Sequence, residues 1–138
     1  MGIKVSIVAA CLLPLACPTS GQITGSKTSL GCINVADVRA RVVAVGRLTN
    51  GTFSGPYRTE RAFILELPHA ICIDDGGDFA DPAERFSKVH VSATSDALLK
   101  VLSVSVGRVV SVSGEGFASH TGHHHAPLVV LADKITVR

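Results

Sequence analysis

Histidine is the residue type with the most chemical potential in this 138-residue chain, because four of its six copies lie within six positions. These are His120, His123, His124 and His125, which stand in the sequence SHTGHHHAP. A neutral imidazole offers a ring nitrogen to Zn²⁺, Cu²⁺ or Ni²⁺. One hypothesis is therefore a metal site with His120, His123 and His125 as ligands and a transition metal such as zinc as the cofactor.

The same histidines have a second interpretation, which the sequence favours. Neighbouring residues of extended backbone point to opposite sides, so His123, His124 and His125 do not easily meet at one ion. A tight structural zinc site would lead us to expect a carboxylate near the histidines, and none accompanies the motif in the sequence. In this interpretation the histidines hydrogen-bond the turn or contact a protein partner.

Other candidate sites are weaker. The aspartates at 74, 75, 78 and 81 lack the terminal Glu of a calcium-binding EF-hand loop, so we interpret them as a solvated acidic connection. We expect His69 to be packed or hydrogen-bonded and His90 to be a solvated strand residue. The chain has no nucleophile-elbow, phosphate-loop or zinc-protease motif, and we predict no catalytic residues.

The first 21 residues have the pattern of a secretory signal peptide. Lys4 supplies a positive charge, and the 12 apolar or small residues from Val5 to Ala16 are too few to span a bilayer. Cleavage after Gly21 would leave residues 22–31 as a flexible tether before a domain at 32–138. Lipidation at Cys17 is the alternative, and it would anchor the protein to a membrane.

Removal of the leader would leave two of the four cysteines in the domain. Cys32 and Cys72 are the two that remain in the domain, and two thiols in an exported protein predict one disulfide. Closing a loop of 40 residues would stabilise the fold by roughly 3–4 kcal/mol. Two buried free cysteines are the alternative.

The elements that must position the histidines are mostly strands. Val-rich or alternating segments predict strands at 41–49, 61–73, 88–92, 108–117 and 128–137, with a loop or irregular hairpin end over 50–60. Between the third and fourth strands, Ser95 is a candidate N-cap for a helix that Gly107 ends.

Five strands with one helix between the third and fourth are the order of an OB-fold, a small five-stranded barrel. Another small barrel or a sandwich is the alternative. In an OB-fold the loop between the last two strands lies beside the loop between the first two. We therefore expect Tyr57, Arg58 and Arg61 to lie near the four histidines and to share a binding surface with them.

Composition disfavours one partner class. Beyond the leader the chain has 12 Lys and Arg against 11 Asp and Glu, with one Tyr and no Trp. Binding of single-stranded nucleic acid needs a basic groove and stacking aromatic side chains. We therefore expect no nucleic-acid partner.

Several motifs resemble those of a bacterial exported family, domain of unknown function 4431. In order along the chain they are Cys32, VGRL at 45–48, TFSGPY at 52–57, Pro68, ICI at 71–73, GRVV at 107–110, SG at 113–114 and HTGHHHAP at 120–127. The resemblance covers about residues 32–136. It implies export, the cysteine pair and the histidine loop as family traits, and it transfers no activity.

Together these observations predict an exported binding module, periplasmic or anchored to the outer membrane of a bacterium. Its expected partner is an envelope protein or another exported macromolecule, and its contact with a membrane is limited to a lipid anchor. Transition-metal binding through the same histidines is the alternative function. A catalytic role has no support from the sequence.

Overall fold

The computed structural model describes residues 31–37 and 39–138. Seven strands and one helix follow one another along this part of the chain. They are β1 (Ile33–Asn34), β2 (Arg41–Ser54), β3 (Thr59–Ile71), β4 (Ile73–Asp74), β5 (Phe86–Ala93), α1 (Asp96–Ser105), β6 (Val109–Ala118) and β7 (Leu128–Val137). The expected signal peptide, the Cys17 lipidation site and residues 22–30 of the tether lie outside the described residues.

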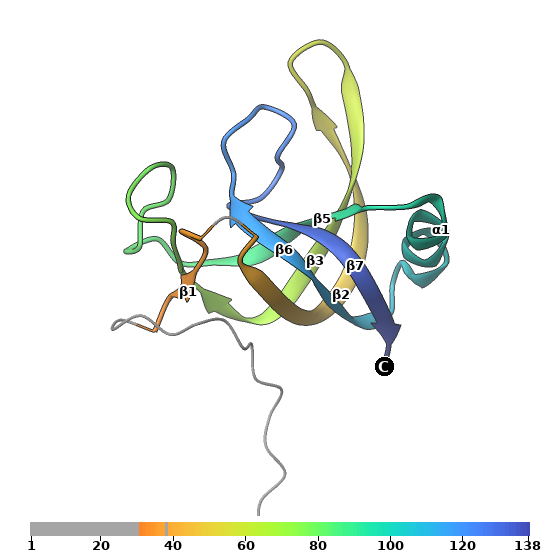
Figure 1. Ribbon diagram of the computed structural model, residues 1–138. Coiled ribbons are helices and arrows are strands. Elements are labelled where there is room, and N and C mark those ends of the chain that lie inside the picture. Colours follow the sequence, from red (N-terminus) through yellow and green to blue (C-terminus); the bar gives the residue numbers. More distant parts are fainter. Residues whose placement is uncertain (1–30, 38) are drawn as a thin grey trace, which may run out of the picture.

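Five strands form a barrel in the order β2-β3-β5-β7-β6, and β6 pairs back onto β2 (Figure 1). All neighbours are antiparallel except β5 and β7, which are parallel. The helix α1 lies in the connection between β5 and β6. The prediction of a five-stranded OB-like barrel with one helix between its third and fourth strands is confirmed.

The barrel interior is filled by aliphatic side chains from all five strands. Fully buried examples are Val42, Leu65, Val89, Val112 and Leu128. Each belongs to an alternating pattern in which every second residue points inward, as the closed sheet requires. Helix α1 adds Leu102, which is also fully buried.

A glycine bends the first long strand. Strand β2 pairs with β6 up to Arg47 and with β3 from Arg47 onward, so it turns from one neighbour to the other near Gly46. A Cβ atom at Gly46 would lie 2.3 Å from the Glu66 carbonyl oxygen. Only glycine allows the β3 backbone to approach this closely.

Residues 50–60, predicted as a loop or irregular hairpin end, form the end of a hairpin that is more regular than expected. The β2–β3 ladder continues to the pair Ser54 and Thr59, so only residues 55–58 form the turn. The turn signal at Gly51 misleads because this glycine makes room within the strand, where its Cβ would lie 2.6 Å from the ring of Phe53. The result is a long hairpin that projects from the barrel (Figure 1).

The predicted strand over 61–73 is divided in the structure. The β3–β5 register shifts between Glu66 and Ile71, where Pro68 interrupts the pattern. After Cys72 the chain forms β4, which pairs in parallel with β1, a short strand the sequence did not predict. The predicted disulfide between Cys32 and Cys72 is confirmed, with Cα atoms 4.7 Å apart.

Hydrogen bonds hold the segment after β4 in place, whereas the sequence predicted a solvated acidic connection there. The Asp75 carboxylate is buried and accepts hydrogen bonds from the backbone amides of Gly77, Phe79 and Ala80. These bonds lower the pKa of Asp75, although burial acts in the opposite direction. The expected solvation is therefore wrong for Asp75.

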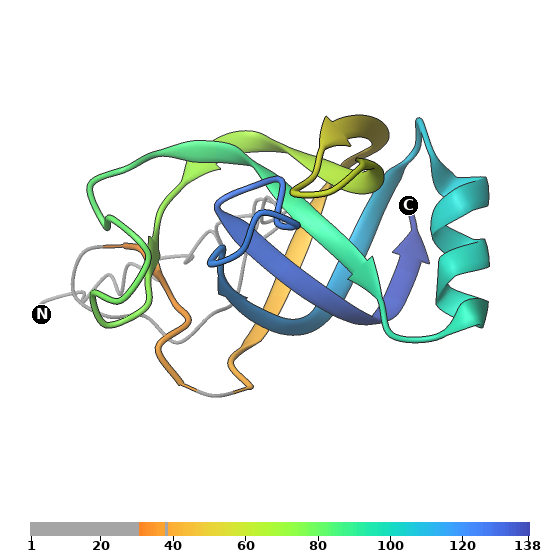
Figure 2. The ribbon, with the colours of Figure 1, turned by 90° about the horizontal axis from the view of Figure 1, so that it is seen from above.

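The helix begins and ends as predicted. The Ser95 hydroxyl accepts a hydrogen bond from the Leu98 amide at 3.3 Å, and Gly107 adopts a positive φ of 86° after the last turn. Helix α1 lies on the opposite side of the barrel from the β1–β4 pair (Figure 2). Within the described ranges, no helix has the length and hydropathy needed to cross a membrane.

Candidate functional site

The hairpin and the histidine loop, residues 119–127, are joined by one carboxylate. Oε1 of Glu60 lies 2.5 Å from Nδ1 of His123, and Oε2 of Glu60 lies 3.2 Å from Nε2 of His125. The His125 side chain is 7% exposed and that of Glu60 is 18% exposed, whereas His123 is 53% exposed. One acid from β3 thus holds two imidazoles of the loop.

A stacked ring pair strengthens the same junction. The rings of Phe53 and His125 are parallel to within 8°, and their centroids are 4.4 Å apart. Phe53 is the cross-strand partner of Glu60, so both side chains reach the loop from the same face of the hairpin. At the tip, Pro56 lies beside Gly122 of the loop. The two loops therefore meet, as the OB-like order predicted.

Beneath the histidine loop lies a small apolar patch on the outside of the barrel. Ile64, His90 and Val129 are neighbours across β3, β5 and β7. Ile64 and Val129 are buried but do not belong to the main core cluster. The loop covers this outer patch, and His90 is half-buried within it. The expectation of a solvated His90 is therefore wrong, because the loop folds back over its strand.

The histidines and phenylalanines of this region form a continuous row of rings. In order the members of this ring row are Phe53, His125, His90, His124 and His120, and the His120 ring contacts both Phe117 and Phe79 at the far end. Successive centroids are 4.4–6.3 Å apart, within the usual range for aromatic contacts. The row crosses the outer face from the hairpin at one end to the loop after β4 at the other.

Ring nitrogens of the row also bond the backbone. His90 Nδ1 accepts from the His125 amide and His124 Nδ1 accepts from the His120 amide, each at 3.2 Å. His120 Nδ1 lies 3.0 Å from the carbonyl oxygen of Ala118. This is the arrangement expected if the histidines hydrogen-bond their own turn.

Packing shifts the pKa values of several of these groups. Burial is the main cause that lowers the pKa of His90 to about 4, with His125 and His124 contributing in the same direction and Glu60 opposing them. Burial likewise lowers the pKa of His124, with neighbouring histidines adding to the effect. For Glu60 burial acts to raise the pKa, but the contacts with His123 and His125 outweigh it and lower the value. His90 is consequently neutral at pH 7, which its role as an acceptor requires.

The proposed ligands His120, His123 and His125 are not gathered at one point. His123 and His125 meet at Glu60, whereas His120 contacts His124 and Phe117. Among residues 31–37 and 39–138, no three His, Cys, Asp or Glu side chains are arranged to hold a metal ion. The metal hypothesis therefore gains no assembled site from this arrangement.

The three predicted hairpin residues lie where the OB-like order places them. Arg58 and Arg61 line a cavity of about 450 Å³ together with Glu60, His123 and His125. Tyr57, at the tip, is 92% exposed. His124 faces the other side of the loop, where it lines a cavity with Phe79 and Phe86. His69 is exposed on β3, so the packed position expected for it is wrong.

Sequence reasoning missed Glu60, Phe53 and His90 as parts of this site. The first two fell in the segment predicted to be a loop or irregular hairpin end, where no register could pair them. The signal for His90 was present, because its strand pairs with the strand after the histidine loop in the OB-like order. Parallel pairing of β5 and β7 brings His90 opposite Val129, directly after the loop.

Comparison with known families bears on one part of this site. Residues 88–136 match the model of a family described as Domain of unknown function (DUF4431). The matched segment runs from β5 to β7 and holds His90 and the whole histidine loop, while Glu60 and Phe53 lie outside it. No match was found among curated proteins.

Proposed function

We propose that this chain is an exported binding module whose contact surface is the hairpin tip together with the histidine loop. The observation that carries the proposal is the brace between the two loops, in which Glu60 holds His123 and His125 and Phe53 stacks on His125. A braced surface loses little conformational entropy when a partner binds. Tyr57 is left 92% exposed at its outer end.

The chemistry of the tip favours a protein partner with acidic groups. Tyr and Arg are the side chains most enriched among the residues that dominate binding energy at protein interfaces. Tyr57 is followed by Arg58, and Arg61 lines the same cavity as Arg58. The acid nearest to them, Glu60, is already engaged by two histidines. An acidic side chain of the partner would therefore meet unopposed guanidinium groups.

Export is the second half of the proposal. The leader pattern of residues 1–21 supports it, and the disulfide between Cys32 and Cys72 is compatible with an oxidising compartment. Expression of the full chain in bacteria, with fractionation and N-terminal sequencing, tests this point. A mature N-terminus near Gln22 or a lipidated Cys17 supports export, and an intact leader in the cytoplasm overturns it.

Partner capture tests the binding surface. Envelope proteins retained by the wild-type domain are compared with those retained by Tyr57→Ala, by Arg58→Glu and by a control variant, Val104→Ala. Val104 is 79% exposed on α1, away from the hairpin. We expect the control to keep the partner and each hairpin variant to weaken binding of the purified partner by about tenfold or more. Recovery of the same material by all four proteins would overturn the proposal.

Transition-metal binding is the alternative function, and one set of contacts supports it. Glu60, His123 and His125 carry the ligand types that Zn²⁺ takes in proteins, a carboxylate and two imidazoles, although their side chains would have to rearrange to bind one ion. Calorimetry with Zn²⁺, Cu²⁺ and Ni²⁺ at pH 7.5 decides between the two functions. Saturable binding that Glu60→Gln and His123→Ala abolish would favour the metal, and heats equal to dilution would exclude it.

A further inference from the structure

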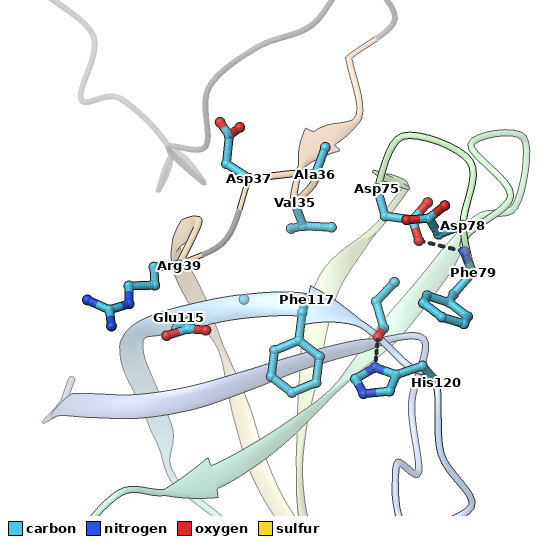
Figure 3. A pocket seen from close by; sticks show the side chains of 12 residues that line it. Val35, Ala36, Asp37, Arg39, Asp75, Asp78, Phe79, Glu115, Phe117 and His120 are labelled. Atoms are coloured by element: carbon cyan, nitrogen blue, oxygen red, sulfur yellow. Dashed lines mark hydrogen bonds between the residues drawn. The ribbon is translucent and has the colours of Figure 1, made fainter.

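A second cavity lies at the far end of the ring row from the hairpin. It has a volume of about 380 Å³, which is at the small end of the range for ligand sites. Three segments line it: the residues after β1, the residues after β4 and the end of β6 (Figure 3). We name it the acidic aromatic pocket.

Aromatic rings form one wall of this pocket. Phe79, Phe117 and His120 lie together (Figure 3), and the centroid of the His120 ring is 5.4 Å from that of Phe79 and 5.4 Å from that of Phe117. Phe79 is 67% exposed, although its backbone amide is fixed by the buried Asp75 carboxylate. A ring held in an exposed position by its backbone is available to a ligand.

Charge at the pocket is predominantly negative. Four carboxylates line it, those of Asp37, Asp75, Asp78 and Glu115, against the single guanidinium of Arg39. The ion pairs found within the described residues use the acids Glu60 and Asp133. None of the four lining carboxylates therefore has a basic partner there.

The pocket walls are fastened to each other. The disulfide joins Cys32 to Cys72, and the Val35 amide donates to the Asp74 carbonyl oxygen at 2.8 Å. The Gly116 amide of β6 donates to the Ala40 carbonyl oxygen at 2.8 Å. These bonds fix the segments after β1 and β4 and the end of β6 before any ligand arrives, so binding need not order them.

We propose that the acidic aromatic pocket binds an arginine side chain of a partner polypeptide. A guanidinium group is attracted to the face of an aromatic ring and donates hydrogen bonds to carboxylates through its planar fork. Phe79 and Phe117 provide ring faces, and Asp78 and Glu115 provide acceptors at either side of them. This site is separate from the hairpin surface and does not depend on the function proposed for it.

Titration of the mature protein with acetyl-Gly-Arg-Gly-amide tests the proposal by NMR or calorimetry. The same peptide with citrulline, which keeps the shape of arginine but has no charge, is the matched ligand control, and a lysine peptide tests the planar group. We expect saturable binding of the arginine peptide and at least about tenfold weaker binding of the citrulline peptide. Absence of arginine binding up to about 10 mM, or equal binding of citrulline, would overturn the proposal.

Variants locate the binding. Asp78→Asn and Phe79→Leu change exposed side chains, so we expect both proteins to fold and to bind the arginine peptide about threefold to tenfold more weakly. Glu66→Gln, an exposed acid on β3, and Tyr57→Ala, on the hairpin, should leave the affinity unchanged. Unchanged affinity in Asp78→Asn and Phe79→Leu would show that the peptide binds elsewhere and would reject the pocket.

Discussion

At the scale of single residues, the histidine loop is held by imidazoles that pack and accept hydrogen bonds. His90 shows this most clearly, since its ring lies between the barrel and the loop and accepts from the His125 amide. Glu60 complements it from the hairpin by contacting two other imidazoles. The cluster therefore couples the conformation of the loop to protonation.

Replacement of the bracing acid should loosen the loop. Glu60→Gln keeps the size of the side chain but removes the charge that both His123 and His125 contact. We expect several-fold faster hydrogen exchange at the loop amides of His124 and His125, with little change in the barrel strands. Hydrogen exchange monitored by NMR measures this, with Glu66→Gln as the control on the same strand. Equal loop protection in both variants would contradict the brace.

Acidification should destabilise the fold through His90. The pKa of His90 is about 4 in the folded protein and about 6.5 in the unfolded chain, so the unfolded chain binds more protons between these values. The stabilisation is present above about pH 6.5 and is lost as the pH falls towards 4. Because the ring is only partly buried, we expect a loss of about 1 kcal/mol rather than the full value of the shift.

A variant isolates this effect. His90→Asn retains an acceptor near the position of Nδ1 but does not titrate, so its free energy of unfolding should depend less on pH between 4 and 6.5. Urea denaturation at several pH values compares it with the wild type. A smaller dependence of the free energy of unfolding on pH should remain in His90→Asn, because the pKa of His124 is also lowered in the folded protein. Identical slopes in the two proteins would rule out His90 as the source.

At the scale of elements, the barrel closes because β2 turns from β6 to β3 at a glycine. This bend allows the 14-residue strand β2 to pair with β6 in its first half and with β3 in its second half. The second half forms the hairpin with β3, the strand that carries Glu60. Strand β2 therefore serves the core at one end and the candidate site at the other. Its bend depends on the close approach of Gly46 to the Glu66 carbonyl.

A side chain at this bend should be costly. Gly46→Ala places a Cβ 2.3 Å from a backbone oxygen, which cannot move without shifting β3. We expect the free energy of unfolding to fall by about 2–3 kcal/mol. In Gly122→Ala the Cβ meets only the Pro56 ring at 3.0 Å, so a change within about 0.5 kcal/mol is expected. Urea denaturation measures both, and similar losses in the two variants would contradict the close-approach argument.

At the scale of the whole molecule, one disulfide joins the start of the domain to the end of β3. The bond between Cys32 and Cys72, with the two-residue pair of β1 and β4, fixes a segment that lies outside the barrel. The barrel itself closes through strand pairing alone. The disulfide thus stabilises the domain and holds the walls of the acidic aromatic pocket, but it does not define the barrel.

Removal of the bond should reduce stability without changing the fold. For Cys32→Ser/Cys72→Ser we expect a loss of roughly 3–4 kcal/mol, the chain-entropy value for a loop of 40 residues. Urea denaturation measures the loss, and reduction of the wild type should reproduce it. Circular dichroism should still show the barrel at low urea. If the variant were as stable as the wild type, the disulfide would not stabilise the protein by constraining its unfolded chain.

The sequence by itself determined the order of the five barrel strands and the helix, the helix cap at Ser95, the cysteine pair and the neighbourhood of the two loops. Each of these depends on local pattern or on the single OB-like order, which alternation and turn residues specify. The family match over residues 88–136 includes the histidine motif that the sequence singled out.

Only the tertiary structure decided how the histidines are arranged. Strand register places Phe53 opposite Glu60 and Ile64 beside His90, and no local pattern reveals register across a segment that was expected to be a loop or irregular hairpin end. The fold of residues 119–127 over an outer apolar patch then turns a cluster that resembled a metal motif into a packed row of rings. The same long-range packing creates the acidic aromatic pocket, whose walls come from three distant segments.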